Sequence, residues 1–239
     1  MKVSDFKDKH KGEMAFLLGG GPSLHYLNID LIKDHITITV NSGIKKHINC
    51  DYFVSDDSDT MSWNYFEESL KYTKPVKFLY KKKFEGKCSH LSQVVLFDHT
   101  WWFSPEDKSY NFDGLKLTKE EPIVGARISM GSAVHLSFLM GCNPIVLLGN
   151  DCQLKNGKRY FWQFPGEQKQ FRVKGRKFTH VTQNRGFNKD SFVEYWNHFA
   201  EVNKDSNVNI VDASDSCLNC FPKMSVEEVL YNYKVGEMK

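Results

Sequence analysis

Residues 14–24 read Met-Ala-Phe-Leu-Leu-Gly-Gly-Gly-Pro-Ser-Leu, and this stretch decides the fold class of the chain. A short apolar run bounded by glycines is typical of a strand buried on both faces, as in a parallel sheet. Because glycine has no Cβ atom, Gly19, Gly20 and Gly21 let backbone N–H groups approach a bound group closely and permit a positive φ. Pro22 and Ser23 are suited to open a helix or a turn. The stretch therefore predicts a first strand followed by a phosphate-binding turn.

The glycine spacing matches neither of the two best-known nucleotide-binding motifs. No Gly-x-Gly-x-x-Gly is completed, and no Lys-Ser/Thr follows the glycines as in a P-loop. Two interpretations of the turn stay open on this ground: a phosphate cradle, or a tight strand-to-helix turn that binds no ligand.

The composition is that of a globular protein with a substantial core. The 239 residues are 41% hydrophobic and 14% aromatic, which favours one large domain over a disordered chain. The formal net charge of +3 is compatible with a phosphorylated or acidic ligand but falls far short of a nucleic-acid-binding signature. The first twelve residues are lysine-rich and polar, no apolar run is long enough to span a membrane, and the six cysteines are scattered; these features predict a cytoplasmic protein with free thiols.

Alternating strand and helix signals along the chain predict an α/β fold. Apolar, β-branched runs predict strands at residues 36–40, 52–55, 76–80, 94–97, 144–149 and 209–212. Helical spacing of apolar residues predicts helices at 63–72, 125–139, 192–202 and 225–231. We expect one domain over residues 1–239, with a mostly parallel sheet flanked by helices and a polar lid insertion at about 153–187.

Polar residues follow several of the predicted strands. Asn41 and Ser42 come after one strand, and Gly149, Asn150 and Asp151 come after another. Because ligands of open α/β sheets collect at the carboxyl ends of the strands, these residues should face the same crevice as the glycine turn. Ser129 and Ser132 open the helix that precedes the second of these strands, where helix N–H groups hold anions.

Several motifs in a fixed order resemble one group of Rossmann-like proteins. They are Gly-Gly-Gly-Pro-Ser-Leu at 19–24, Asn41, the glycine- and serine-led helix at 125–139, Leu-Leu-Gly-Asn-Asp-Cys at 147–152, and Asp-Ala-Ser followed by Phe-Pro-Lys-Met-Ser-Val-Glu-Glu-Val-Leu at 212–230. The group holds the 6-hydroxymethylpterin diphosphokinase-like family with the motility accessory factors, and the related bacterial sialyltransferases that use CMP-sialic acid. The resemblance implies a Rossmann-like fold and a nucleotide-sugar-dependent glycosyltransferase that uses a CMP-type donor and a glycan or other hydroxyl acceptor, with no tightly bound cofactor.

The same resemblance implies roles for particular residues. Those implied to lie against the nucleotide are Gly19, Gly21, Pro22, Ser23, Asn41, Ser129, Ser132, Gly149 and Asp151. Tyr160 would support the leaving phosphate and His180 would be the general base. Gly20 stands where the sialyltransferases carry asparagine. A histidine that titrates near neutral pH and a tyrosine hydroxyl that donates a hydrogen bond suit such a transfer.

Two other functions stay open at this point. A diphosphokinase that moves pyrophosphate from ATP to a pterin alcohol would need Mg²⁺ and carboxylates to hold it, and Asp57 and Asp59 in the Asp-Asp-Ser-Asp cluster at 56–59 are the candidates for such a metal site. The same cluster is equally explained as an acidic turn at the end of a strand. A non-catalytic nucleotide-binding module is the third alternative, and the residues leave a homo-oligomer open.

Overall fold

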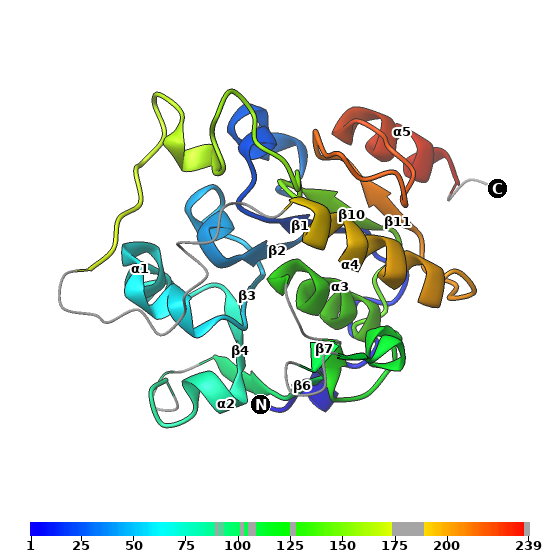
Figure 1. The fold of residues 1–239 in the computed structure, drawn as a ribbon, viewed down its shortest axis with the longest axis horizontal. Helices are drawn as coiled ribbons and strands as arrows, with labels where there is room; N and C mark the ends of the chain where they lie inside the picture. Colours follow the sequence, from blue (N-terminus) through cyan, green and yellow to red (C-terminus); the bar gives the residue numbers. More distant parts are fainter. Residues whose placement is uncertain are drawn as a thin grey trace.

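The structure is a computed structural model of the 239-residue chain. It describes residues 1–88, 91, 93–100, 103–104, 109–124, 128–173 and 189–236, with the backbone alone at 58, 59, 103, 104, 109, 110, 189–191 and 234–236. Apart from the successive strands β5 to β8, between residues 94 and 110, the described elements alternate between strands and helices (Figure 1).

Seven parallel strands form the central sheet, in the order β11-β10-β1-β2-β3-β4-β5. Every neighbouring pair in this sheet is parallel, which confirms the predicted fold class. The strands are β1 (Ala15–Leu18), β2 (Ile36–Val40), β3 (Tyr52–Ser55), β4 (Val76–Tyr80), β5 (Val94–Phe97), β10 (Ile145–Leu148) and β11 (Ile210–Asp212).

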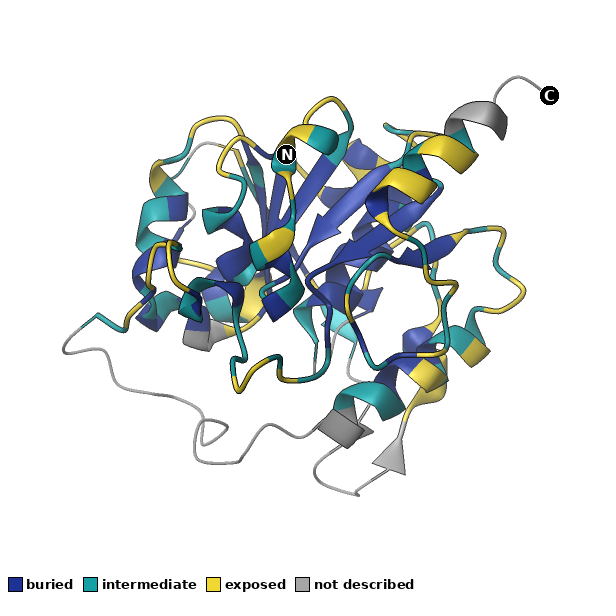
Figure 2. Ribbon diagram, turned by 90° about the horizontal axis from the view of Figure 1, so that it is seen from above, coloured by how far each residue is buried: buried dark blue, intermediate teal, exposed yellow. Residues whose placement is uncertain are grey.

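The two faces of the sheet are buried under different elements. Because successive side chains of a strand point to opposite faces, Ala15 and Leu17 of β1 join one core cluster while Phe16 and Leu18 join the other. Helices α3 (Ser129–Leu139) and α4 (Lys189–Val202) contribute to the first cluster, and α5 (Val226–Gly236) contributes to the second. Most residues of the central strands are accordingly buried, and these strands are largely dark blue in Figure 2.

Smaller elements surround this frame. They are the helices α1 (Asn64–Lys71) and α2 (Lys81–Phe84), the parallel pair β6 (His99–Thr100) with β9 (Ile123–Val124), and the antiparallel pair β7 (Phe103–Ser104) with β8 (Ser109–Tyr110). No helix in the described ranges is long and apolar enough to cross a membrane.

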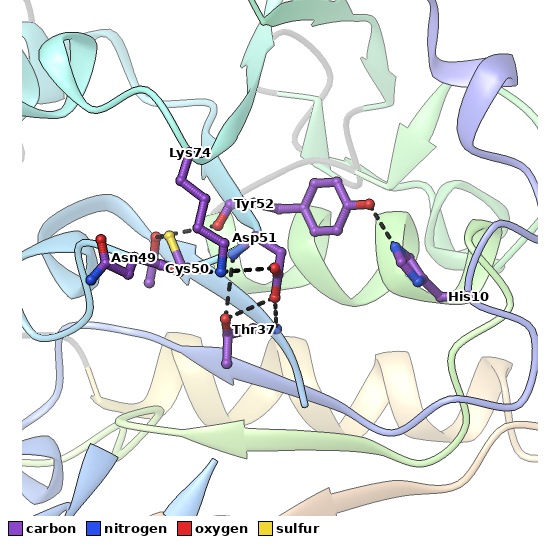
Figure 3. Close-up of polar contacts among 8 residues, drawn as sticks. His10, Thr37, Asn49, Cys50, Asp51, Tyr52 and Lys74 are labelled. Atoms are coloured by element: carbon purple, nitrogen blue, oxygen red, sulfur yellow. Dashed lines mark hydrogen bonds and ion pairs between the residues drawn. The ribbon is translucent and has the colours of Figure 1, made fainter. Parts of the chain in front are cut away.

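Polar contacts tie together the amino-terminal ends of β2 and β3. The carboxylate of Asp51 accepts hydrogen bonds from the Thr37 backbone N–H at 2.9 Å and from its hydroxyl at 3.1 Å, and it pairs with Lys74 at 3.2 Å (Figure 3). Beside this group the Tyr52 hydroxyl lies 2.6 Å from Nε2 of His10. The polar groups at this end of β2 and β3 thus bind one another.

The strand order reverses direction at β1. The chain runs from β1 through β2, β3, β4 and β5 on one side, and returns to β10 and β11 on the other. In doubly wound sheets the crevice at such a switch point, outside the carboxyl ends of the strands, is where ligands bind. The topology thus directs attention to the loops that follow β1 and β10.

Candidate active site

A cavity of about 300 Å³ lies at this switch point. Its walls come from the loops after four strands: residues 19–22 after β1, 41 and 42 after β2, 57 and 60 after β3, and 149–153 after β10. Ser129 of α3 and Tyr160 complete the set of predicted residues that line it. Ser23 and Ser132, also predicted for the site, are not in the lining and lie one layer behind it.

The glycine turn after β1 is held against β10 rather than left open. The N–H groups of Gly19 and Gly21 donate to the carbonyl oxygens of Leu148 and Gly149, each at 2.8 Å. Gly21 has φ −66°, so its conformation is not the positive-φ one that the sequence allowed for. What requires glycine here is close approach of two backbone segments. Gly20, between them, faces Ser42 and the ring of Tyr160.

Asp151 is buried at the cavity wall and is held by Ser23. Its two carboxylate oxygens accept the Ser23 backbone N–H at 3.1 Å and the Ser23 hydroxyl at 3.0 Å. Burial is the largest influence on this carboxyl group and raises its pKa to about 6, although the hydrogen bonds from Ser23 act in the opposite direction. A carboxyl group that titrates close to neutral pH in a cavity is suited to acid–base chemistry.

Asn41 is positioned by a chain of hydrogen bonds that begins at Asp56. It follows β2 with φ +49°, a conformation that asparagine tolerates better than most residues. Its Nδ2 donates to the Ser129 hydroxyl at 3.1 Å, and the Ser129 hydroxyl donates to Asp56. The Ser132 hydroxyl also donates to Asp56, at 2.7 Å. Ser132 thus contributes to the site through Asp56.

Three buried polar atoms of the lining residues have no hydrogen-bond partner within the described part of the chain: Oδ1 of Asn41, Nδ2 of Asn150 and Nε1 of Trp162. Leaving a buried polar group unsatisfied costs about 1–3 kcal/mol, so native proteins rarely do so without a reason such as a ligand. The set holds one acceptor and two donors. A polar ligand of this cavity that offered both a donor and acceptors could satisfy atoms of this kind.

Aromatic rings form another wall of the cavity. Tyr160 and Trp162 stack with ring centroids 5.1 Å apart and an interplanar angle of 10°, and Trp162 lies 5.6 Å from Trp63. The Arg172 guanidinium lies 4.6 Å from the centroid of Trp63. Flat apolar surfaces of this kind suit a nucleobase or the apolar face of a sugar ring.

The predicted lid is anchored where it is described. Phe161 and Phe164 are buried, and the Phe161 N–H donates to the carbonyl of Gly20 at 3.1 Å. Glu167 accepts from Lys46 at 2.9 Å and lies 3.0 Å from Nδ1 of His25. Residues 161–167 therefore pack onto the core, and Tyr160 takes its place in the cavity wall from this anchor.

Some predicted residues fall outside the described part of the chain. His180 is one of them, as are residues 125–127 at the start of the predicted helix, and α3 begins at Ser129. Of the carboxylates suggested for a metal site, Asp57 lines the cavity and is exposed, whereas the side chain of Asp59 is not described. Over the described residues, no group of three or more metal-ligating side chains comes together.

Among the contributors to the site that the sequence did not reveal are Asp56 as the anchor of Ser129, and Trp63 and Trp162 as cavity walls. Asp56 stood in the acidic cluster at the end of β3, and its place after a strand was the available signal. Nothing in the sequence distinguished Trp63 and Trp162 from other aromatic residues of the chain.

Comparison with known proteins supports the fold. No protein-family model matches the sequence, and no curated protein matches it. One solved structure that resembles it is the MAf glycosyltransferase from Magnetospirillum magneticum AMB-1, with a TM-score of 0.53 and 11% sequence identity. The alignment covers 99% of this chain and 40% of that one, so this chain spans about two-fifths of the length of its structural neighbour. At this identity the likeness concerns the fold alone.

Proposed function

We propose that this chain transfers a sugar from a nucleotide-activated donor to a hydroxyl acceptor. The observation that carries the proposal is the cavity at the switch point of the sheet, together with the buried, unpartnered atoms of three of its lining residues, Asn41, Asn150 and Trp162. A glycosyltransferase with the same fold and the sequence resemblance to sialyltransferases both agree with it. The finer version of the proposal is a CMP-type donor, with sialic acid as its sugar.

The cavity offers suitable groups for each part of such a donor. The stacked Tyr160 and Trp162 rings supply a flat surface for a base or sugar, and the amides of Asn41 and Asn150 supply polar contacts. In this proposal the Tyr160 hydroxyl donates to the departing phosphate. A hydrogen bond that strengthens as negative charge develops there would lower the barrier.

The transfer also needs a base for the acceptor hydroxyl. We assign this role to His180, because an imidazole titrates near neutral pH. Asp151 is the second candidate, because its pKa is raised to about 6 and it lies in the cavity wall. Variants of the two residues would separate these assignments.

Thermal denaturation with CMP, CDP, UDP, GDP and ATP, each with and without Mg²⁺, tests the proposal. A nucleotide that binds only the folded protein, at 100 times its Kd, adds about 2.7 kcal/mol to the free energy of unfolding. We expect CMP to stabilise the protein without metal. The Asn41→Ala variant should lose about 1–3 kcal/mol of that stabilisation. Asn49→Ala is the matched control, because Asn49 precedes β3 and lies at the amino-terminal ends of the strands, away from the cavity.

A second measurement addresses turnover. Release of CMP from CMP-N-acetylneuraminic acid in the presence of a glycan acceptor would support the glycosyltransferase. Stabilisation by ATP with Mg²⁺ and by no cytidine nucleotide would favour the diphosphokinase instead, with the exposed carboxylate of Asp57 as the first metal ligand to test. Binding of a nucleotide without turnover of any donor would favour the non-catalytic nucleotide-binding module.

A further inference from the structure

Asp56 lies just behind the cavity. It follows β3, is 8% exposed and is absent from the cavity lining, whereas Ser129 and Asn41 are both in that lining. An ionised carboxylate can only accept hydrogen bonds. The two hydroxyls that contact it, those of Ser129 and Ser132, must therefore be the donors.

This fixes the direction of the next hydrogen bond. A serine hydroxyl carries one proton, and that of Ser129 is directed to Asp56. The Ser129 oxygen is then left as an acceptor for Asn41, at 3.1 Å, and only the Nδ2 end of the Asn41 amide can donate to it. The two ends of an asparagine amide are told apart by such a network.

The direction of these hydrogen bonds determines which end of the Asn41 amide is left without a partner. With Nδ2 committed to Ser129, the opposite end of the amide, Oδ1, is buried and without a partner among the described residues. This atom is an acceptor. We propose that Asp56 is a positioning residue that, through Ser129, fixes the direction of the Asn41 amide, so that a ligand group that reaches the Oδ1 end of this amide must be a hydrogen-bond donor.

The nature of the ligand in this inference rests on the proposed function. In a cytidine nucleotide, two kinds of group can meet an acceptor: the exocyclic amine of the base and the hydroxyls of the ribose. A phosphate oxygen, which is an acceptor itself, is the wrong partner for Oδ1. We therefore expect Asn41 to read the base or the ribose rather than the phosphate.

Two substitutions at position 56 separate hydrogen bonding from simple packing. In Asp56→Ala the Ser129 proton has no carboxylate to meet and is free to turn to Asn41, so the amide loses its fixed direction. In Asp56→Asn the new Oδ1 still accepts from Ser129. Its Nδ2 can donate to Ser132, whose own proton has the Val124 carbonyl 3.1 Å away. Asp56→Asn should therefore keep the fixed direction of the Asn41 amide, which Asp56→Ala should lose.

The first readout needs no ligand. The side-chain NH₂ group of Asn41 is observed by ¹H–¹⁵N NMR in the whole chain and assigned by its absence from Asn41→Ala. We expect its resonances to shift, and its exchange with solvent to accelerate, in Asp56→Ala. Both should stay as in the wild type in Asp56→Asn. The matched control is Ser132→Ala, which removes the other hydroxyl from Asp56 and leaves the Ser129 contact in place. An unchanged Asn41 amide in Asp56→Ala would overturn the positioning role.

The second readout is the binding of CMP, UMP, 2′-deoxy-CMP and 3′-deoxy-CMP by calorimetry. UMP replaces the amine by a carbonyl, and each deoxy analogue lacks one ribose hydroxyl, so the weakest of the three analogues identifies the group that Asn41 reads. We expect the wild type and Asp56→Asn to prefer CMP about 5- to 10-fold over one analogue, and Asp56→Ala to lose this preference. Equal weakening of all four nucleotides in Asp56→Ala, or no preference for CMP over any analogue in the wild type, would overturn the selection. If no nucleotide binds while the NMR result holds, the proposed function fails and the positioning of Asn41 stands.

Discussion

Gly21 and Asp151 are in such close contact that a Cβ atom at position 21 would lie 1.9 Å from Oδ2 of Asp151. The same atom would lie 2.6 Å from the carbonyl oxygen of Gly149. The absence of a side chain at Gly21 therefore lets the turn after β1 close onto the loop after β10. This contact joins the two halves of the doubly wound sheet at the cavity.

Replacing Gly21 by alanine should consequently destabilise the protein as a whole. One methyl group has to displace both a carboxylate and a backbone oxygen, and overpacking of this kind costs about 1–3 kcal/mol. Urea denaturation at pH 7 measures the loss in free energy of unfolding. Gly20→Ala is the matched control, because its nearest neighbour, at 2.8 Å, is the end of the Ser42 side chain, which can rotate away. Equal stability of the two variants would contradict this account.

The fold could be predicted from the sequence because its signals are local. The run Ile-Thr-Ile-Thr-Val at 36–40 is β-branched throughout, and β2 occupies those residues. Ser225 and Glu228 form the reciprocal contacts of a helix cap at 2.6 Å and 3.1 Å, at the start that the sequence indicated for the last helix. Helix bounds were less accurate: the last helix ends at Gly236 rather than 231.

The candidate site was predictable only in part, because its geometry depends on distant pairs. That Asn41 and the glycine turn share a crevice follows from where their strands end. By contrast, Asp56 and Ser129 are 73 positions apart, and Ser23 and Asp151 are 128 apart. A single sequence gives no signal for such pairs. It also could not show that Ser23 holds the cavity residue Asp151, or that Ser132 contacts Asp56 behind the lining.

The raised pKa of Asp151 predicts a pH dependence of stability. The pKa is about 6 in the folded protein and 3.8 for the ordinary group, so this residue stabilises the fold fully below pH 3.8 and loses that contribution as the pH rises through 6. The difference between the two pKa values corresponds to about 3 kcal/mol. Urea denaturation of the wild type and of Asp151→Asn between pH 4 and 7 measures it. The wild type should lose stability relative to the variant as the pH rises; a constant difference would contradict the shift.

The contribution of His135 to stability should depend on pH in the opposite direction to that of Asp151. It is fully buried in α3, its Nδ1 accepts the Val124 N–H at 2.6 Å, and its Nε2 lies 2.7 Å from the Thr118 carbonyl. Burial lowers its pKa from 6.5 to about 4. Its contribution is therefore present above pH 6.5 and lost as the pH falls through 4, by about 3 kcal/mol in total. The stability of the wild type should fall relative to His135→Gln over this range, as measured by denaturation at each pH.

Trp162→Phe should weaken nucleotide binding without loosening the cavity wall. Phenylalanine keeps a ring against Tyr160 but removes the buried Nε1 donor, which has no partner among the described residues. Loss of one hydrogen bond to a ligand corresponds to about a 5- to 10-fold higher Kd for CMP. Calorimetry measures the affinity, and the melting temperature of the free protein should not fall, because the removed donor has no partner there. Tyr26→Phe, an exposed aromatic outside the cavity, is the control; a Kd unchanged in Trp162→Phe would remove Nε1 from the binding site.

The identity of the base requires two variants, because the midpoint of a pH–rate profile cannot supply it. An imidazole has an ordinary pKa of about 6.5, and the pKa of Asp151 is about 6, so either group would give an acidic limb in nearly the same place. If His180 is the base, His180→Ala should lower turnover by about 10²–10⁴ and abolish the acidic limb, while CMP affinity stays nearly intact. Asp151→Asn should then keep that limb, whatever it does to the rate. The reverse pattern, with the limb lost only in Asp151→Asn, would assign the proton transfer to the carboxylate and leave His180 outside the mechanism.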